Sequence, residues 1–327
     1  MICTFGELLL RFSPALDGEW IHAARMPVYV GGAELNVVTA LSTWQLPVRY
    51  CTRLPDHALT NEITEELIQQ NVDTAFLVGG ERIGIYYLPQ GSDLANAGVI
   101  YDRAYSSFAE LKPGMINWDK VLDGCSWFHF SAISPALNKN VAAVCKEAVL
   151  AASAKGLTIS VDLNYRSKLW QYGKRPTDVM PELVQHSHII MGNMWAAKSL
   201  LGIPSPIDKS SGKTMEQLIE ASEESMLQLH KYYPAATSLA YTFRLEKEYW
   251  ALLQHGEETA VSKKFIMENV VDKVGSGDCF MAGLIYGLYH KHTAQNIVDY
   301  AAAAAFGKLY ELGDATRQTI NEVNARL

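Results

Sequence analysis

The chain has 327 residues, which is enough for one large α/β domain or two smaller ones around a buried core. Hydrophobic residues make up 49% of the chain, charged residues 19%, and the formal net charge is −7, which is an ordinary globular composition. No basic block points to nucleic acid and the longest strongly apolar run, 280–289, is too short to cross a bilayer, so we expect neither a nucleic-acid nor a membrane partner.

The five cysteines are an odd number and none lies in a CxxC pair. This pattern argues against a disulfide framework and against a zinc site. The chain begins at once with a strand-like run, 2–12, with no basic region or cleavage signal before it. We therefore expect a cytoplasmic protein with reduced thiols.

The first glycine-containing junction lies at 28–44, where a short strand leads through Gly31 and Gly32 into a helix. Asn36 falls in the first turn of that helix. Its amide could reach a ligand held over the glycines, or it could serve only as a local backbone partner. The local pattern leaves both interpretations open.

The next segment, 48–78, alternates strand, helix (about 57–70) and strand, as a βαβ unit does. The runs 83–88 and 98–103 then predict two short strands, a hairpin added to the main sheet. Both runs carry tyrosine, and the second ends in Arg103. The hairpin could close on an anionic ligand, or its tyrosines could simply pack across the strands.

From residue 126 the alternation resumes, with strands at 126–130, 157–163 and 188–192 and helices at about 138–155 and 177–187. Asp162, Asn164 and Arg166 follow one another at the end of a strand. The carboxyl ends of parallel strands form the ligand crevice of an open sheet, so we expect these three side chains to converge there.

A polar helix at about 212–232 and strands at 237–243, 248–254 and 258–262 lead to the most informative stretch, 270–283. It predicts a strand end, a turn with Gly275 and Gly277, the acid Asp278 and a helix. Free amides at a helix N-terminus favour an anion. Asp278 could cap the helix, or it could accept a proton in a phosphoryl-transfer site whose amides hold the moving group.

Taken together and in this order, these motifs resemble the ribokinase-like (PfkB) sugar kinases over nearly the whole chain. Gly31-Gly32 with Asn36 matches the amino-terminal signature of that family, and 272–278 matches its carboxy-terminal signature with the catalytic Asp. A narrower resemblance is to the 2-keto-3-deoxygluconate kinases. It rests on Gly6-Glu7, 31–34, Tyr86, 101–103, 131–137 and 162–166 with Leu169-Trp170.

The resemblance implies one α/β domain spanning 1–327, a Rossmann-like three-layer ribokinase fold with a small β-sheet lid from segments near 12–30 and 83–103. It implies ATP and Mg²⁺ as cofactors, a sugar acid as substrate, and a homo-oligomer. Asp278 would be the base, assisted by the amides of Gly275, Ser276 and Gly277. The residues implied for the substrate are Gly32, Asn36, Tyr86, Tyr101, Arg103, Ile133 and Arg166, and those implied for the nucleotide are Asn164, Asn193, Thr242 and Arg244.

Two departures from the family pattern concern metal and nucleotide. Ala196 stands where the family often has a glutamate that organises magnesium, and the stretch 241–248 lacks the usual glycine. No residue is therefore assigned to the metal.

The alternatives to a kinase of 2-keto-3-deoxygluconate are a fructokinase or ribokinase of the same fold, or a non-catalytic sugar-acid sensor. Arg103 together with Arg166 favours a carboxylated substrate over a neutral sugar.

Overall fold

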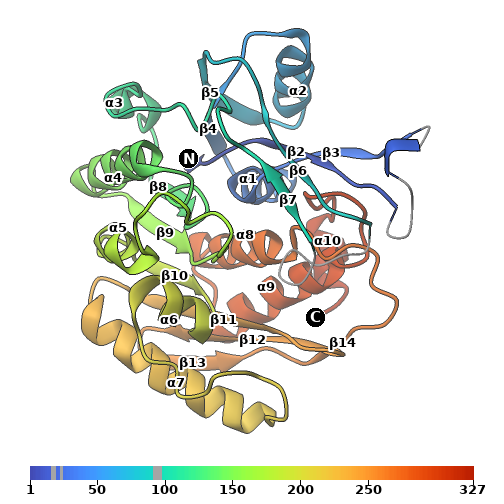
Figure 1. Cartoon of the computed structure of the whole chain (residues 1–327). Helices are drawn as coiled ribbons and strands as arrows, with labels where there is room; N and C mark the ends of the chain where they lie inside the picture. The colour runs from blue at the N-terminus through green and yellow to red at the C-terminus, as the bar shows by residue number, and fades with distance from the viewer. Residues whose placement is uncertain (16–19, 23–24, 91–97) are drawn as a thin grey trace.

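The computed structural model describes residues 1–15, 20–22, 25–90 and 98–327. A large mixed sheet runs through the molecule, and a smaller sheet lies beside one part of it (Figure 1). The order of strands in the large sheet is β13-β12-β11-β10-β9-β8-β1-β4-β5, with β14 paired to β12. Its strands are β1 (Ile2–Phe5), β4 (Val48–Leu54), β5 (Val72–Val78), β8 (Trp127–Ser131), β9 (Thr158–Asp162), β10 (Ile189–Gly192), β11 (Ser238–Arg244), β12 (Glu248–His255), β13 (Glu258–Val261) and β14 (Phe265–Ile266).

Helices cover both faces of this sheet, so the architecture has the expected three layers (Figure 1). One face packs against α3 (Trp118–Val121), α4 (Lys139–Ala154), α5 (Met180–Val184), α6 (Met194–Leu201) and α7 (Met215–Tyr232). The other packs against α1 (Ala33–Thr43), α2 (Ala58–Gln69), α8 (Ser276–Tyr289), α9 (Ala294–Lys308) and α10 (Ile320–Asn324). Two short 3₁₀ turns, η1 (Trp20–His22) and η2 (Pro176–Asp178), complete the described elements.

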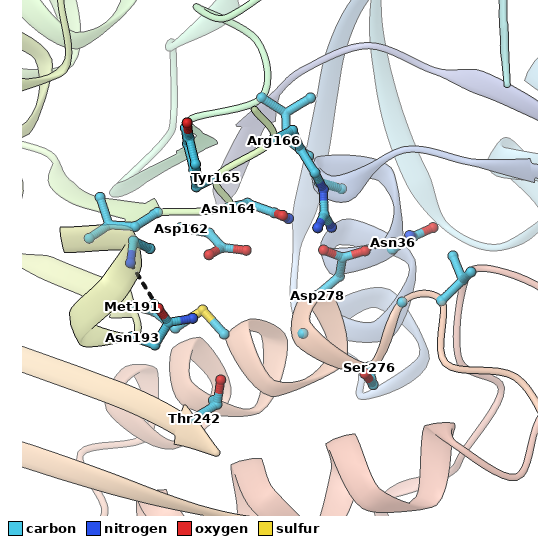
Figure 2. Close-up of a pocket in the computed structure, with 18 of the residues that line it drawn as sticks. Asn36, Asp162, Asn164, Tyr165, Arg166, Met191, Asn193, Thr242, Ser276 and Asp278 are labelled. Atoms are coloured by element: carbon cyan, nitrogen blue, oxygen red, sulfur yellow. Dashed lines mark hydrogen bonds between the residues drawn. The ribbon is translucent and has the colours of Figure 1, made fainter. Parts of the chain in front are cut away.

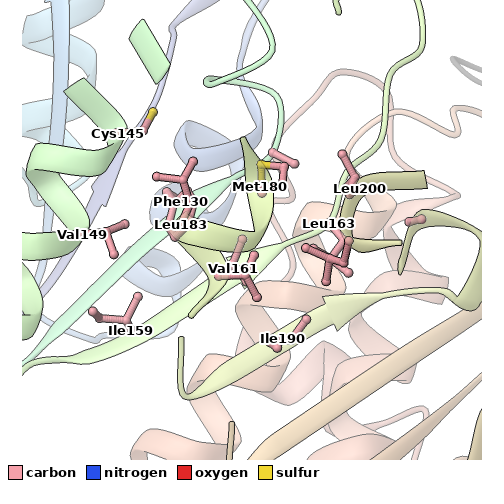
Figure 3. Close-up of a cluster of buried hydrophobic side chains, with 14 of the residues drawn as sticks. Phe130, Cys145, Val149, Ile159, Val161, Leu163, Met180, Leu183, Ile190 and Leu200 are labelled. Atoms are coloured by element: carbon pink, nitrogen blue, oxygen red, sulfur yellow. The ribbon is translucent and has the colours of Figure 1, made fainter. Parts of the chain in front are cut away.

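Each face has its own apolar core. Figure 3 shows part of the first core, in which strand and helix side chains pack together: Phe130, Val161, Ile190, Val149, Leu183 and Leu200. In the second core α8 and α9 lie very close, because a Cβ added to Gly283 would come within 2.6 Å of Ala301 Cα. This tight contact anchors the helix that begins at the Gly275 turn.

The small sheet is the expected lid, and its strand order is β3-β2-β6-β7. Its strands are β2 (Leu9–Phe12), β3 (Val28–Gly31), β6 (Gly84–Tyr87) and β7 (Ile100–Asp102). The two runs near 83 and 98 do form an antiparallel pair. They do not extend the main sheet as expected. Instead β6 pairs with β2, and both strands belong to the separate small sheet. Parts of the expected lid segments, 16–19, 23–24 and 91–97, lie outside the described residues.

The predicted first strand, 2–12, is in fact two strands that belong to different sheets. The backbone leaves the strand conformation at 6–8, so β1 lies in the main sheet and β2 in the lid. The expected helix at 177–187 is shorter as well: it is the turn η2 followed by α5, with Pro181 in the first turn. Proline lacks an N–H and favours a helix start at that place.

The helix expected at 212–232 begins at Met215 because Thr214 caps it. The Thr214 hydroxyl accepts from Gln217 N, and the Gln217 side chain accepts from Thr214 N in return.

None of the helices in the described residues is long and apolar enough to cross a membrane.

Candidate active site

A cavity of about 580 Å³ lies between the ends of β9, β10 and β11, the first turns of α1, α6 and α8, and the lid (Figure 2). The topology explains its place, because parallel strands end at one edge of the sheet and helix N-termini face that edge. All fifteen residues that the sequence suggested for catalysis, substrate and nucleotide line this cavity. They are Gly32, Asn36, Tyr86, Tyr101, Arg103, Ile133, Asn164, Arg166, Asn193, Thr242, Arg244, Gly275, Ser276, Gly277 and Asp278.

The turn before α8 leaves an open space above its amides. Gly275 has φ 78°, and a Cβ there would lie 1.8 Å from the carbonyl oxygen of Asp314, so only glycine fits. A Cβ on Gly277 would meet nothing within 4 Å. Gly275 is the residue at the N-cap and provides no side-chain cap, so the first N–H groups of α8 are not occupied by a capping side chain.

Asp278 does not act as a helix cap, which was one of its two interpretations. Its Oδ2 accepts a hydrogen bond of 2.7 Å from Nδ2 of Asn36 in the first turns of α1. Asn36 is therefore not merely a local backbone partner. Its own Oδ1 is buried and has no hydrogen-bond partner among the described residues, which leaves an acceptor beside the cavity.

Burial raises the pKa of Asp278 to about 6, and the hydrogen bond from Asn36 and the charge of Arg166 oppose that rise. At neutral pH the carboxylate is mainly ionised but its pKa is close to the working pH. A general base works best under this condition.

The three polar residues after β9 converge on Asp278 as expected. Figure 2 shows the Arg166 guanidinium directed toward the Asp278 carboxylate, with Asp162 and Asn164 beside it. Asp162 is 5% exposed, and burial together with the charge of Asp278 raises its pKa well above the usual value. Arg166 counteracts this shift, so it is the cation between two buried acids.

Arg103 and Arg166 differ in whether a nearby acid forms an ion pair with the guanidinium. Arg103 is 5% exposed and pairs with Glu7, with Nε 2.6 Å and Nη2 2.5 Å from Oε2. The Ser106 hydroxyl donates to the other Glu7 oxygen. The Arg166 guanidinium acts on Asp162 and Asp278 through its charge, but it makes no hydrogen bond or ion pair within the described part of the chain, so its donors are free for a ligand.

Tyr86 and Tyr101 pack across the strands of the lid hairpin, which was one of its two interpretations. They are cross-strand partners with ring centroids 6.4 Å apart, and both line the cavity. The Tyr86 hydroxyl also donates to Asp314 Oδ2 at 2.6 Å. The lid is thus connected to the loop after α9.

Comparison with known proteins agrees with this geometry. Residues 1–316 match the model of the pfkB family carbohydrate kinases. The protein is a pfkB family carbohydrate kinase. It is 30% identical to the 2-dehydro-3-deoxygalactonokinase of Haloferax volcanii, over 98% of this chain and 95% of that protein.

The structure of the kinase is similar to that of the 2-dehydro-3-deoxygluconokinase from Thermotoga maritima. The TM-score is 0.88 at 30% identity, and the match covers 99% of this chain and 97% of the other. An E. coli protein solved in complex with ATP and Mg²⁺ has a TM-score of 0.77 at 16% identity, with 99% and 98% of the two chains covered. At that identity the likeness shows a shared fold. The fold is therefore the ribokinase-like one.

In the cavity of the kinase, Arg244 extends from the end of β11 to the Gly275 turn. Its Nη1 lies 3.1 Å from the Ser276 hydroxyl oxygen and 3.3 Å from the Lys273 carbonyl oxygen. Asn193 begins α6 and accepts from Ala196 N at 2.8 Å. These are two of the four residues predicted for the nucleotide, and all four line the cavity.

The residues that line the cavity could hold Mg²⁺ only if phosphate groups supplied further ligands. Asp162 and Asp278 are hard oxygen donors, which Mg²⁺ prefers, but no group of three or more His, Cys, Asp or Glu side chains suited to a metal occurs among the described residues. Mg²⁺ commonly keeps several waters and binds through phosphates and one or two carboxylates. This chain fits that mode.

Several buried acids that line the cavity were not assigned a role from the sequence. Glu34 accepts from both the backbone N–H and the hydroxyl of Ser131, and burial raises its pKa to about 7. Glu7 and Glu34 were part of the resemblance to the 2-keto-3-deoxygluconate kinases, which was a usable signal. Asp314 belongs to no motif in the sequence, and only the fold brings it to Tyr86.

Proposed function

We propose that the protein phosphorylates 2-keto-3-deoxygluconate on its 6-hydroxyl with ATP. The observation that carries the proposal is the position of Asp278. It is buried, held by Asn36, and lies between the open amides of the Gly275 turn and the unpaired guanidinium of Arg166. A base, an anion site and a free cation in one cavity suit phosphoryl transfer to a hydroxyl of an acidic sugar.

In the proposed reaction Asp278 accepts the proton of the attacking hydroxyl. The hydroxyl oxygen forms a bond to the γ-phosphorus, and the bond to the ADP oxygen breaks. The amides of Gly275, Ser276 and Gly277 neutralise charge that develops on the transferred group. Mg²⁺, when bound with the nucleotide, screens the phosphate charges. Arg244 binds phosphate near Ser276.

The free guanidinium of Arg166 binds the sugar carboxylate in this proposal. Tyr86, Tyr101, Ile133 and Arg103 then form the remaining wall, with the carboxylate of Glu7 holding Arg103 in place. A neutral hexose or ribose would leave Arg166 without a partner in the cavity. This supports an acidic substrate over the fructokinase and ribokinase alternatives.

The second candidate substrate is 2-keto-3-deoxygalactonate, which differs only in configuration at C4. It is favoured by the 30% identity to the Haloferax volcanii enzyme, whose name specifies that sugar acid. One hydroxyl changes direction between the two substrates, and a hydrogen bond gained or lost there corresponds to roughly tenfold in kcat/KM.

A coupled assay of ADP release tests the proposal with both sugar acids, fructose and ribose at several Mg²⁺ concentrations. We expect the highest kcat/KM for 2-keto-3-deoxygluconate. A higher value for the galactonate epimer would change the substrate, and a higher value for fructose or ribose would remove the sugar-acid assignment. Sugar-acid binding by calorimetry without any phosphate transfer would support the sensor instead. Homo-oligomerisation stays a prediction, which sedimentation would check.

A further inference from the structure

Lys308, the last residue of α9, is buried to an extent unusual for lysine. Its exposed fraction is 0%, and it is the only lysine among the fully or nearly fully buried side chains in the described residues. A cation at a helix C-terminus interacts favourably with the helix dipole, but that effect works equally for an exposed lysine. Burial of an ammonium is unfavourable unless other charges and acceptors compensate it.

The compensation comes from the loop that follows α9 and from the strand end before the Gly275 turn. Lys308 Nζ donates to the Glu311 carbonyl oxygen at 3.1 Å. Burial lowers the pKa of Lys308, while the charges of Asp272, Glu311 and Asp314 oppose that change. Among these acids, Asp272 pairs with Arg11 from the lid through Nη2 at 2.6 Å. Two cations from distant elements therefore share one group of acids.

This charged group lies directly against the turn that begins α8. The position of a Cβ on Gly275 would be 3.3 Å from Lys308 Cε and 1.8 Å from the Asp314 carbonyl oxygen. Gly275 is thus enclosed by the 308–314 segment. The 308–314 segment therefore limits where the turn at 275–277 can lie, and Lys308 is bonded to that segment through the Glu311 carbonyl.

We propose that Lys308 is a positioning residue for phosphoryl transfer. Its ammonium fixes the 308–314 segment against Gly275, aims the amides of 275–277 at the transferred phosphoryl, and adds a positive potential behind them. This inference rests on the proposed function. It extends the site to a residue that does not line the cavity.

The test compares Lys308→Met, which keeps length and apolar volume, and Lys308→Gln, which keeps a donor for the Glu311 carbonyl. Lys146→Met is the control, because that lysine is exposed and pairs with Glu182 on the far helices. We expect kcat to fall on the order of ten- to a hundredfold in both Lys308 variants, with KM for the sugar acid changed less than about twofold. The control should keep both constants.

A merely structural role would not give that separation of kcat from KM. Wild-type kcat in Lys308→Gln would overturn the proposal, and so would equal losses in kcat and in sugar-acid affinity. If Lys308→Met does not fold, Lys308→Gln decides the question. Partial recovery of kcat in Lys308→Ala on addition of ethylammonium is a further expected result, since the small cation can enter the vacated space.

Calorimetry with a non-hydrolysable ATP analogue and with adenosine separates this inference from the proposed function. We expect Lys308→Gln to weaken the analogue at least fivefold and adenosine hardly at all, because only the analogue carries phosphates. A wild-type protein that binds the analogue but phosphorylates no sugar acid would contradict the proposed function alone. Equal affinities of wild type and variant for the analogue would contradict the role of Lys308.

Discussion

Asp278 is the residue to which we assign the base of the proposed reaction. Replacement by asparagine keeps the shape of the side chain but removes the proton acceptor. We expect Asp278→Asn to lower kcat by roughly a hundred- to ten-thousandfold while sugar-acid affinity changes little. Asp208→Asn, at a side chain 90% exposed, is the control. Turnover near the wild-type rate would exclude Asp278 as the base.

The pH dependence follows from the same carboxylate. Because burial raises its pKa to about 6, the ionised base is present above that pH and is lost as the pH falls through it. We therefore expect kcat/KM to be level above pH 7 and to fall about tenfold per unit well below pH 6. A profile that stays level to pH 5 would show that another group accepts the proton.

The two arginines of the substrate wall should respond differently to removal. Arg166→Leu should weaken a sugar acid far more than a neutral ketose, since only the acid loses a charge-assisted hydrogen bond, worth about 1.5–3 kcal/mol. Calorimetry with both ligands measures this. Equal losses for both would contradict the binding of the carboxylate by Arg166.

Arg103→Leu should act first on stability, because it leaves the Glu7 carboxylate buried without its cation. Removal of one partner of a buried pair costs about 3–5 kcal/mol in the free energy of unfolding. Urea denaturation checks this value. Arg82→Leu, which breaks a more exposed pair with Asp102, should cost less than about 1 kcal/mol. Equal costs for the two variants would show that burial does not control the effect.

At the scale of elements, the two glycines before and within α8 have separable roles. Gly275→Ala would place a Cβ 1.8 Å from a backbone oxygen and force a non-glycine residue to φ 78°, so we expect a marked loss of thermal stability. Gly277→Ala meets no atom within 4 Å, and alanine favours a helix by about 1 kcal/mol.

Gly277→Ala should therefore keep or raise the melting temperature and still lower kcat, because its methyl group occupies the space where the phosphoryl would lie. Thermal denaturation and the ADP-release assay on the same two variants provide the comparison. Unchanged kcat in Gly277→Ala would place the transferred group elsewhere in the cavity.

Across the whole molecule, buried polar contacts join the lid to the segments before α8 and after α9. Arg11 of β2 lies between Asp272 and Asp314, and Tyr86 of β6 donates to Asp314. Asp272 precedes the Gly275 turn and Asp314 encloses it. The position of the lid and the position of the anion turn are thus determined by the same two acids.

Tyr86→Phe tests this connection. The variant loses its hydrogen bond to a buried carboxylate, so we expect faster hydrogen exchange at 84–87 and a KM for the sugar acid raised on the order of tenfold, with a smaller change in kcat. Tyr105→Phe, at a side chain 80% exposed, is the control. Unchanged exchange at 84–87 would contradict a role of the Tyr86 hydroxyl in holding the lid.

Features that obey local rules could be predicted from the residues alone. Gly275 was recognisable because a turn with positive φ before a helix requires glycine, and Asp162, Asn164 and Arg166 because parallel strands end at a common edge. The layers, the lid and every suggested cavity residue followed from such patterns together with the family resemblance. The division of 2–12 into strands of two sheets did not, because the alternation of apolar residues is the same in either sheet.

Which polar groups contact one another depends on how the whole chain folds. Asn36 donates to an aspartate 242 residues away, Tyr86 to one 228 residues away, and Arg103 pairs with an acid 96 residues earlier. These pairings depend on how helices and the lid pack over the sheet, and no local spacing encodes them. They show that Asp278 is held by Asn36 and does not cap α8, and that Glu7 rather than a ligand pairs with Arg103 in this structure.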